Sequence, residues 1–519
     1  MQASIRRTAG RVLAPAALAL GIVAGPAVAQ RAPDVAALDA YFAKAQQDWG
    51  VPGMAVAIVK DGKVVLAKGY GVRELGKAGR VDEHTLFAIA SNTKAFTATA
   101  LATLVDEGKL SWDDRVQKYL PWYQLYDPFV SQDMRVRDLL SHRSGLGTFS
   151  GDLLWYGTTY SPEEVARRIR YLEPAGPYRG SYGYSNVSFV TAGLLIPAIS
   201  GRSWIDYVSA RILRPIGMTE TVASVDSLPR RSDVATPHAR WRGQTIRIPW
   251  YDWDNMVAAG GIISSAHDMA RWLELQLNGG ELDGTRVVSA ARQREMWTPQ
   301  ISFEVGEASQ KRFPSTHFRG YGMAFTLNDY LGRKIVGHTG GYDGMYSRVV
   351  LVPEERLGLV VLTNSTTNVS TPLMYRVLDA YLGGAERDWS TEMLAEARAA
   401  DRAEAARRDS IVGKPAPGAK PTLPLQAYAG TYSGDLYGDA TVRLEGGKLV
   451  LRLLPSPDLV ADLTPRGGDA FILEWRRRFP FFDRGVATFV PNDVGTPTEL
   501  RLNVPNQDFW FEELKLTRR

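Results

Sequence analysis

The sequence predicts an α+β protein, in which an antiparallel sheet flanked by helices has a helical subdomain beside it and is followed by a small all-β, barrel-like domain. Three observations predict it. Alternating apolar segments occur near both ends of residues 35–385, helical patterns dominate the region between them, and alternation returns with frequent Gly turns after residue 423. The length of 519 residues exceeds what a single hydrophobic core normally supports, so more than one domain is expected.

The strands of the sheet are predicted at its two sequence ends. Met54–Val59 and Val64–Lys68 are apolar runs joined around Asp61-Gly62, a typical hairpin turn. Tyr346–Val352 and Leu357–Thr363 form a second pair of apolar runs. Because sequentially distant strands must then share one sheet, the helical middle is expected to lie beside it.

The N-terminal segment has the three parts of a secretory signal. Within residues 1–29, three arginines precede the apolar run Val12–Gly25, and Ala27–Ala29 offers a small-residue cleavage site. The segment therefore predicts export by the general or twin-arginine route to the periplasm or beyond it, with an uncleaved membrane anchor as the alternative reading. No other membrane association is expected.

Four segments follow from these patterns. We expect a signal peptide at 1–29, a main domain at 30–389, a helix and Pro-rich linker at 390–422, and a C-terminal β domain at 423–519.

Composition excludes several classes of function. The chain has no cysteine, which excludes disulfides, thiolate metal sites and cysteine nucleophiles. Removing residues 1–29 lowers the formal charge from +5 to +2, so nucleic acid is not an expected partner. No His-Glu-x-x-His and no Gly-x-Ser-x-Gly motif occurs, which argues against a zinc hydrolase and an α/β-hydrolase. No metal and no cofactor are expected.

The first candidate motif is Ser91-Asn92-Thr93-Lys94, at the start of a helix predicted from Ser91 to Glu107. A serine hydroxyl needs a base to take its proton, and a lysine can act as that base when burial lowers its pKa. Positions i and i+3 share one face of a helix, so Lys94 is expected beside Ser91. The apolar residues around the motif favour burial of the lysine.

The second candidate motif is Tyr184-Ser185-Asn186, within a Gly-rich loop. A tyrosine beside the lysine could move a proton from the serine to the leaving group. The side-chain amide of Asn186 could hold both the lysine and a substrate carbonyl.

The third candidate motif is His338-Thr339-Gly340-Gly341, at a predicted strand. Its small residues let a substrate approach the strand edge. The N–H groups of Gly341 and Ser91 could together form an oxyanion hole.

These three motifs, in this order, resemble those of the penicillin-recognising serine hydrolases, the family of class C β-lactamases, DD-peptidases, D-aminopeptidases and related esterases. The resemblance covers residues 35–385 and includes two further stretches, Leu139–Leu146 and Gly260–Ala270. It implies a β-lactamase/transpeptidase-like fold. His142 and His267, which lie in these stretches, are interpreted as packing or hydrogen-bonding residues.

The resemblance also implies roles for the motif residues. Ser91 is the acylated nucleophile, Lys94 and Tyr184 handle protons, and the substrate-binding residues are Asn186, His338, Thr339 and Gly340. His338 departs from the lysine of the family motif, which recognises the β-lactam carboxylate, so strong β-lactamase activity is not expected. The C-terminal domain resembles the lipocalin-like domain of some D-aminopeptidase-like members, most clearly at Tyr428–Tyr432.

The sequence therefore predicts an exported serine hydrolase that forms a Ser91 acyl-enzyme with small ester or amide substrates, either D-amino-acid peptides or carboxylic esters. The alternatives are a β-lactamase, a DD-carboxypeptidase, and a sensor of cell-wall peptides or β-lactams that is acylated without turnover. The expected partner is a small molecule or short peptide, and the sequence sets no oligomeric state.

Overall fold

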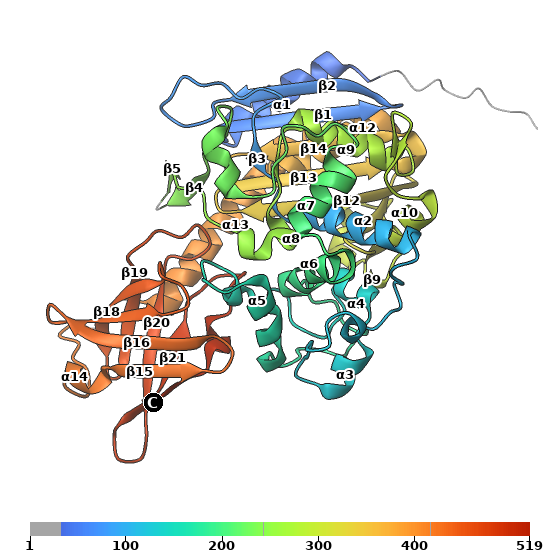
Figure 1. Cartoon of the computed structure of the whole chain (residues 1–519). Coiled ribbons are helices and arrows are strands. Elements are labelled where there is room, and N and C mark those ends of the chain that lie inside the picture. Colours follow the sequence, from blue (N-terminus) through green and yellow to red (C-terminus); the bar gives the residue numbers. More distant parts are fainter. Residues whose placement is uncertain (1–32, 242, 416) are drawn as a thin grey trace, which may run out of the picture. The chain divides into compact units, whose positions relative to one another are not determined.

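A computed structural model describes residues 33–519 except Arg242 and Ala416, and the predicted signal peptide lies outside this part. Asp34–Arg519 form one compact unit. Its main sheet has eight strands, all antiparallel to their neighbours (Figure 1). In spatial order they are β2 (Lys63–Gly71), β1 (Gly53–Lys60), β14 (Leu357–Thr363), β13 (Met345–Val352), β12 (Arg333–Tyr342), β11 (Thr326–Tyr330), β10 (Arg319–Tyr321) and β9 (Ile301–Phe303).

The two sequence ends of the sheet meet at the β1–β14 pair, in which Met54 lies opposite Thr363. The β1–β2 hairpin turns at Asp61 and Gly62, which have φ angles of 53° and 72°. Positive φ at both central residues of such a turn matches the twist of the strands it joins. The predicted sheet and hairpin are therefore confirmed.

Both faces of the sheet are covered, so β1 is apolar at successive positions. Met54, Val56 and Ile58 pack with α1 (Val35–Asp48) and α12 (Ser370–Leu382). The alternate β1 residues belong to the larger core on the other face. The helices packed in that core include α2 (Thr93–Asp106) and α9 (Ala266–Leu277).

A helical region lies beside the sheet and supplies loops to the site described below. Its helices are α3 (Pro128–Asp133), α4 (Val136–Leu140), α5 (Pro162–Arg168), α6 (Asn186–Ser200), α7 (Trp204–Val208), α8 (Val257–Gly260) and α10 (Ala290–Met296). A further short helix, α11 (Glu307–Arg312), contacts α12 and α13 (Trp389–Val412) instead. Short two-stranded sheets pair β3 (Phe87–Ala88) with β6 (Ile263–Ser264), β4 (His238–Trp241) with β5 (Gln244–Arg247), and β7 (Glu281–Leu282) with β8 (Thr285–Arg286).

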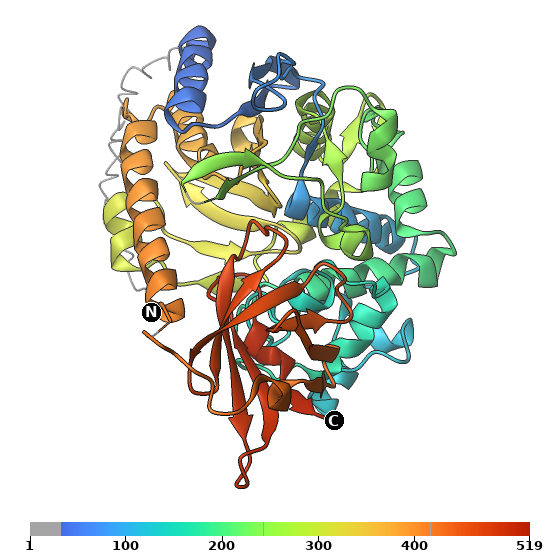
Figure 2. The same cartoon turned by 90° about the vertical axis from the view of Figure 1, so that its left-hand side faces the viewer.

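The C-terminal strands close into an eight-stranded antiparallel barrel, as the lipocalin-like resemblance implies, because β15 also pairs with β22. The long helix α13 (Trp389–Val412), orange in Figure 2, precedes the barrel and packs against α12 and β20. A short helix, α14 (Leu425–Tyr428), leads into it. The barrel strands are β15 (Gly430–Gly434), β16 (Gly438–Glu445), β17 (Lys448–Leu453), β18 (Val460–Gly467), β19 (Ala470–Trp475), β20 (Arg484–Pro491), β21 (Pro497–Asn503) and β22 (Leu516–Arg518).

Among the described residues, no helix combines the length and the apolar character needed to cross a membrane.

The packing of α2 against α9 gives a stability prediction. Phe96 is fully buried and stacks on Trp272 with ring centroids 3.8 Å apart. Phe96→Ala should lower the free energy of unfolding by about 3–5 kcal/mol, because it leaves a cavity in a packed core. Phe129→Ala removes the same atoms from a residue that is 71% exposed and should change stability by less than about 0.5 kcal/mol. Denaturant unfolding measures both; equal losses would contradict this account of the core.

Candidate active site

Ser91 lies in a tight turn, Ala90–Asn92, that directly precedes α2. The predicted helix therefore begins at Thr93, two residues later than expected. Ala90 adopts a left-handed φ of 46°, a conformation that costs a non-glycine residue about 1–3 kcal/mol. Fixed neighbours hold it: the Ile89 N–H donates to Ile262 O at 3.0 Å, and the Ser347 hydroxyl donates to Ile89 O at 2.6 Å.

Lys94 has no exposed surface, and its Nζ lies 2.9 Å from Ser91 Oγ. Nζ also donates to Asn186 Oδ1 at 2.7 Å and to Ala259 O at 2.9 Å. Burial lowers the pKa of Lys94 to about 7, and the nearby Asp152 opposes this shift. A neutral amine has two N–H groups, which these two acceptors occupy, so its lone pair is left for the Ser91 hydroxyl.

Tyr184 completes the group around the nucleophile. Lys94 Nζ lies 4.9 Å from the centre of its ring. Burial raises the pKa of the Tyr184 hydroxyl well above its ordinary value, and interaction with the Ser91 side chain opposes this rise. The net pKa stays high, so the hydroxyl keeps its proton. The ring of His142 packs on that of Tyr184 with centroids 4.2 Å apart, and His142 Nδ1 accepts the Ser185 N–H at 3.0 Å.

Asn186, the first residue of α6, links the lysine to a buried acid that the sequence did not reveal. Its Nδ2 donates to Asp152 Oδ2 at 2.7 Å, which fixes the amide so that Oδ1 faces Lys94. Burial raises the pKa of Asp152 to about 8. Only the ionised carboxylate favours the charged lysine, so the raised pKa of Asp152 limits how far this acid offsets the burial of Lys94.

Strand β12 carries the third motif and passes directly beside the turn Ala90–Asn92, which contains Ser91. A Cβ added at Gly340 would lie 2.2 Å from Ile89 O and 2.9 Å from the Ser91 nitrogen. Only glycine permits this approach. Gly341 follows Gly340 in the strand, opposite Tyr346 of β13, where a Cβ would meet no atom within 4 Å.

His338 is buried, and both of its ring nitrogens have partners in the protein. Nδ1 donates to Thr339 O at 2.6 Å, so Nε2 accepts the hydroxyl of Tyr321 at 2.9 Å. The Tyr321 oxygen accepts in turn from Nε2 of His142 at 3.2 Å, because His142 Nδ1 is already an acceptor. Burial lowers the pKa of His338 to about 3. His338 is therefore neutral and carries no charge for a substrate carboxylate.

The barrel contributes to this region through residues 504–515. The Glu513 carboxylate accepts the Ser150 hydroxyl at 2.5 Å and the Gly151 N–H at 2.9 Å, directly before Asp152. Burial raises the pKa of Asp508 to about 6, and Asp508 in turn adds to the raised pKa of Asp152.

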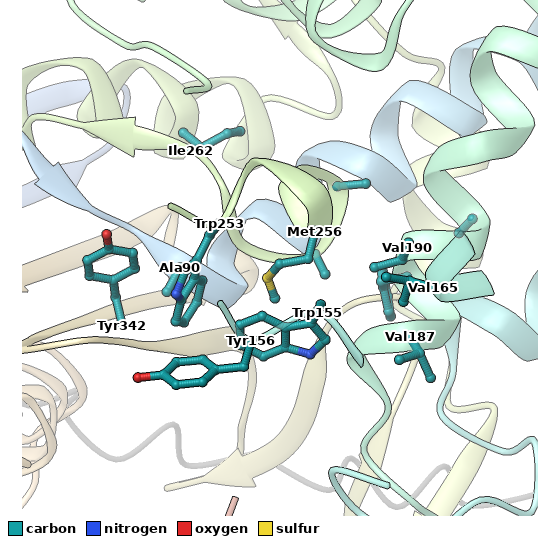
Figure 3. Close-up of a cluster of buried hydrophobic side chains, with 14 of the residues drawn as sticks. Ala90, Trp155, Tyr156, Val165, Val187, Val190, Trp253, Met256, Ile262 and Tyr342 are labelled. Atoms are coloured by element: carbon teal, nitrogen blue, oxygen red, sulfur yellow. The ribbon is translucent and has the colours of Figure 1, made fainter. Parts of the chain in front are cut away.

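Aromatic side chains fill the space behind the site. Figure 3 shows three of them, Trp155, Tyr156 and Trp253, among buried residues near Ala90, which precedes Ser91. Phe509 of the barrel contacts Tyr156 with ring centroids 4.4 Å apart. The aromatic residues of these loops therefore serve packing against the barrel.

The structure thus brings Ser91, Lys94, Tyr184 and Asn186 together and places β12 beside them. The supporting residues that sequence reasoning missed are Asp152, Ser347, Tyr321 and Glu513. No motif marks them, since each acts through a contact with a residue at least 34 positions away in the chain. His142, by contrast, was identified from the sequence as a packing or hydrogen-bonding residue, because it lies in the recognisable stretch Leu139–Leu146.

Both parts of the chain are similar to known protein families. Residues 38–382 match the Beta-lactamase family profile, and residues 414–518 match a domain of unknown function (DUF3471). Unguisins hydrolase ungD of Aspergillus violaceofuscus is 30% identical over 430 residues, covering 77% of this chain and 75% of its own.

Solved structures show the same fold. The octameric penicillin-binding protein homologue from Pyrococcus abyssi superimposes with a TM-score of 0.60 at 25% identity, covering 93% of this chain and all of its own. A D-stereospecific amidohydrolase from Streptomyces sp. gives a TM-score of 0.53 at 24% identity over 68% of this chain and all of its own.

The chain belongs to the Beta-lactamase family. It is a serine hydrolase of the β-lactamase fold with a C-terminal lipocalin-like barrel.

The close approach of β12 to the turn Ala90–Asn92 gives a second prediction. Gly340→Ala should lower stability by about 1–3 kcal/mol, because its Cβ meets backbone that cannot move without displacing the Ser91 turn. Gly341→Ala is the matched control, since its Cβ meets nothing within 4 Å. Thermal unfolding compares the two variants, and equal melting temperatures would show that the approach is looser than described.

Proposed function

We propose that this protein is an exported hydrolase that forms an acyl-enzyme on Ser91 with small ester or amide substrates, namely D-amino-acid peptides or carboxylic esters. The observation that carries the catalytic part is the buried Lys94, whose Nζ lies 2.9 Å from Ser91 Oγ and whose pKa is lowered to about 7. Export to the periplasm or beyond it rests on the sequence of residues 1–29 alone.

Acylation begins when Ser91 Oγ attacks the substrate carbonyl carbon and Lys94 Nζ takes the hydroxyl proton. The carbonyl double bond opens, and the N–H groups of Ser91 and Gly341 stabilise the negative oxygen. As the carbonyl re-forms, the scissile C–N or C–O bond breaks, the Tyr184 hydroxyl gives its proton to the leaving nitrogen or oxygen, and Lys94 returns a proton to Tyr184.

Deacylation uses the same groups with water as the nucleophile. Lys94 accepts a proton from water through Tyr184 or directly, and the acyl–Oγ bond breaks as Oγ regains a proton. Asn186, held by Asp152, keeps the lysine aligned through both halves. The site residues therefore end each cycle in their starting protonation states.

Charge favours substrates that lack a carboxylate beside the scissile bond. His338 stands where the family has a lysine, and it is neutral with both nitrogens occupied. Asp508 of the barrel segment 504–515 has a pKa of about 6, so it adds a negative charge at neutral pH. Both features weigh against a β-lactamase or a DD-carboxypeptidase, whose substrates carry that carboxylate.

The names of two similar proteins support hydrolysis, and one of these names specifies an amide bond. One relative is named an unguisins hydrolase, and one structural neighbour is named a D-stereospecific amidohydrolase. We therefore place D-amino-acid amides and peptides first among the substrates, and simple carboxylic esters second.

A substrate panel tests the proposal. Purified mature protein should turn over D-Ala p-nitroanilide or p-nitrophenyl esters faster than nitrocefin or a D-Ala-D-Ala peptide. Ser91→Ala should abolish turnover, and Tyr184→Phe should lower kcat/KM by about 10²–10⁴-fold because the proton donor to the leaving group is lost.

Tyr182→Phe is the matched control for Tyr184→Phe. It removes the same hydroxyl from a neighbouring, half-buried tyrosine that contacts His142 and Tyr321 by its ring, and it should leave the rate near that of the unmodified protein. Full turnover by Ser91→Ala would refute the nucleophile assignment. Ser91-dependent labelling without turnover of any substrate would instead establish a sensor.

The pH dependence follows from Lys94. Below pH 7 the amine is protonated and cannot accept the serine proton, so kcat/KM should rise with pH through about 7. The charge of Asp152 raises the pKa of Lys94, so Asp152→Asn should move the rise in kcat/KM to lower pH. A rise in kcat/KM centred near the ordinary lysine pKa of about 10.4 would show that Lys94 is not the base.

A further inference from the structure

A cluster of two histidines and one glutamate lies outside the site described above. His84 is in the loop before β3, Glu220 is in the loop after α7, and His267 is the second residue of α9. His84 Nδ1 lies 2.6 Å from Glu220 Oε1, and His267 Nδ1 lies 3.9 Å from Glu220 Oε2. One ligand atom from each residue lies within 4.8 Å of the other two.

Backbone contacts fix the three segments that carry these side chains. The His267 N–H donates to Glu83 O at 2.9 Å, which ties the start of α9 to the loop of His84. The Glu220 N–H donates to Asp268 Oδ2 at 2.9 Å. The three Cα positions are therefore set by the fold, and only side-chain torsions remain to be adjusted.

The side chains of His84 and His267 are each 47% exposed, so an ion in solution can reach them. Their rings already lie side by side, with centroids 4.9 Å apart. A tetrahedral cation with bonds of about 2.0–2.1 Å requires ligand atoms about 3.4 Å apart. The ligand atoms lie within 4.8 Å of one another, so side-chain rotation must shorten the longest separation by about 1.4 Å at most.

The surrounding charge is negative. Glu83 Oε1 lies 3.9 Å from His84 Nε2, and Asp268 Oδ1 lies 3.3 Å from His267 Nδ1. Together with Glu220, three carboxylates face two imidazoles. A divalent cation would balance this charge while both imidazoles stay neutral.

We propose that His84, Glu220 and His267 form a binding site for a first-row divalent cation of the zinc type. Two imidazoles and one carboxylate suit zinc and its neighbours, whereas calcium and magnesium prefer oxygen ligands alone. The site lies outside the hydrolytic chemistry, and the cation is not a reactant there.

The cation would link the two segments that support the turn Ala90–Asn92. His84 precedes β3 and His267 follows β6, and these strands pair through Phe87 and Ser264. The chain continues from β3 to Ile89, whose N–H bonds Ile262 O beside β6. Binding should therefore stabilise the folded protein, because the three ligands are far apart in the unfolded chain.

Zinc chloride titrated into the tag-free mature protein tests the proposal by calorimetry, with thermal unfolding as a second readout. We expect one zinc ion per chain, a raised melting temperature, and no binding of calcium or magnesium. His84→Gln and His267→Gln should each weaken zinc binding by at least about tenfold, since even outer-shell partners of metal ligands contribute about 10–100-fold.

His317→Gln is the matched control, because His317 is exposed and is not part of the cluster. It should leave zinc affinity and the zinc-induced rise in melting temperature unchanged. Absence of zinc binding, or equal binding by the double variant His84→Gln/His267→Gln, would overturn the proposal and leave an ordinary histidine–glutamate hydrogen bond.

Discussion

The Lys94 amine can accept a proton from the Ser91 hydroxyl only because the lysine is completely buried. Much of the surrounding structure contributes to that burial. An exposed lysine would stay protonated near neutral pH and could not take a proton from serine. Here Asn186 Oδ1 and Ala259 O occupy the two N–H groups of the neutral amine, so its lone pair is left for Ser91. Helix α2 carries Lys94, α6 begins at Asn186 and α8 contains Ala259, so the packing of these three helices brings the partners to one point.

A second layer of contacts fixes the groups that touch the lysine. Asp152 orients the Asn186 amide, and Glu513 of the barrel holds the backbone just before Asp152. On the other side, His142 packs on Tyr184 and begins a chain of hydrogen bonds through Tyr321 to His338. Residues of the barrel segment 504–515 therefore help to hold the groups around Lys94, which gives the C-terminal domain a structural role in the candidate site.

Much of this could be predicted from the sequence because the signals are local. Ser91 and Lys94 are three residues apart, Tyr184 and Asn186 are two apart, and the hairpin at Asp61 follows from its turn residues and flanking strands. The substitution of His338 for lysine was also visible. The start of α2 was predicted two residues too early, since helix ends depend on capping contacts, and here the Ser91 turn is held by β12 and β13.

The sequence by itself determined the family motifs, the strand and helix pattern, and the change in character at the C-terminal domain, because each is encoded in neighbouring residues. Only the tertiary structure decided the lowered pKa of Lys94, the neutral state of His338, and the parts played by Asp152 and Glu513. These properties arise from burial and from contacts between segments up to hundreds of residues apart, such as Ser150 with Glu513. Such contacts leave no periodic pattern in a single chain, since they depend on how the sheet, the helices and the barrel pack together.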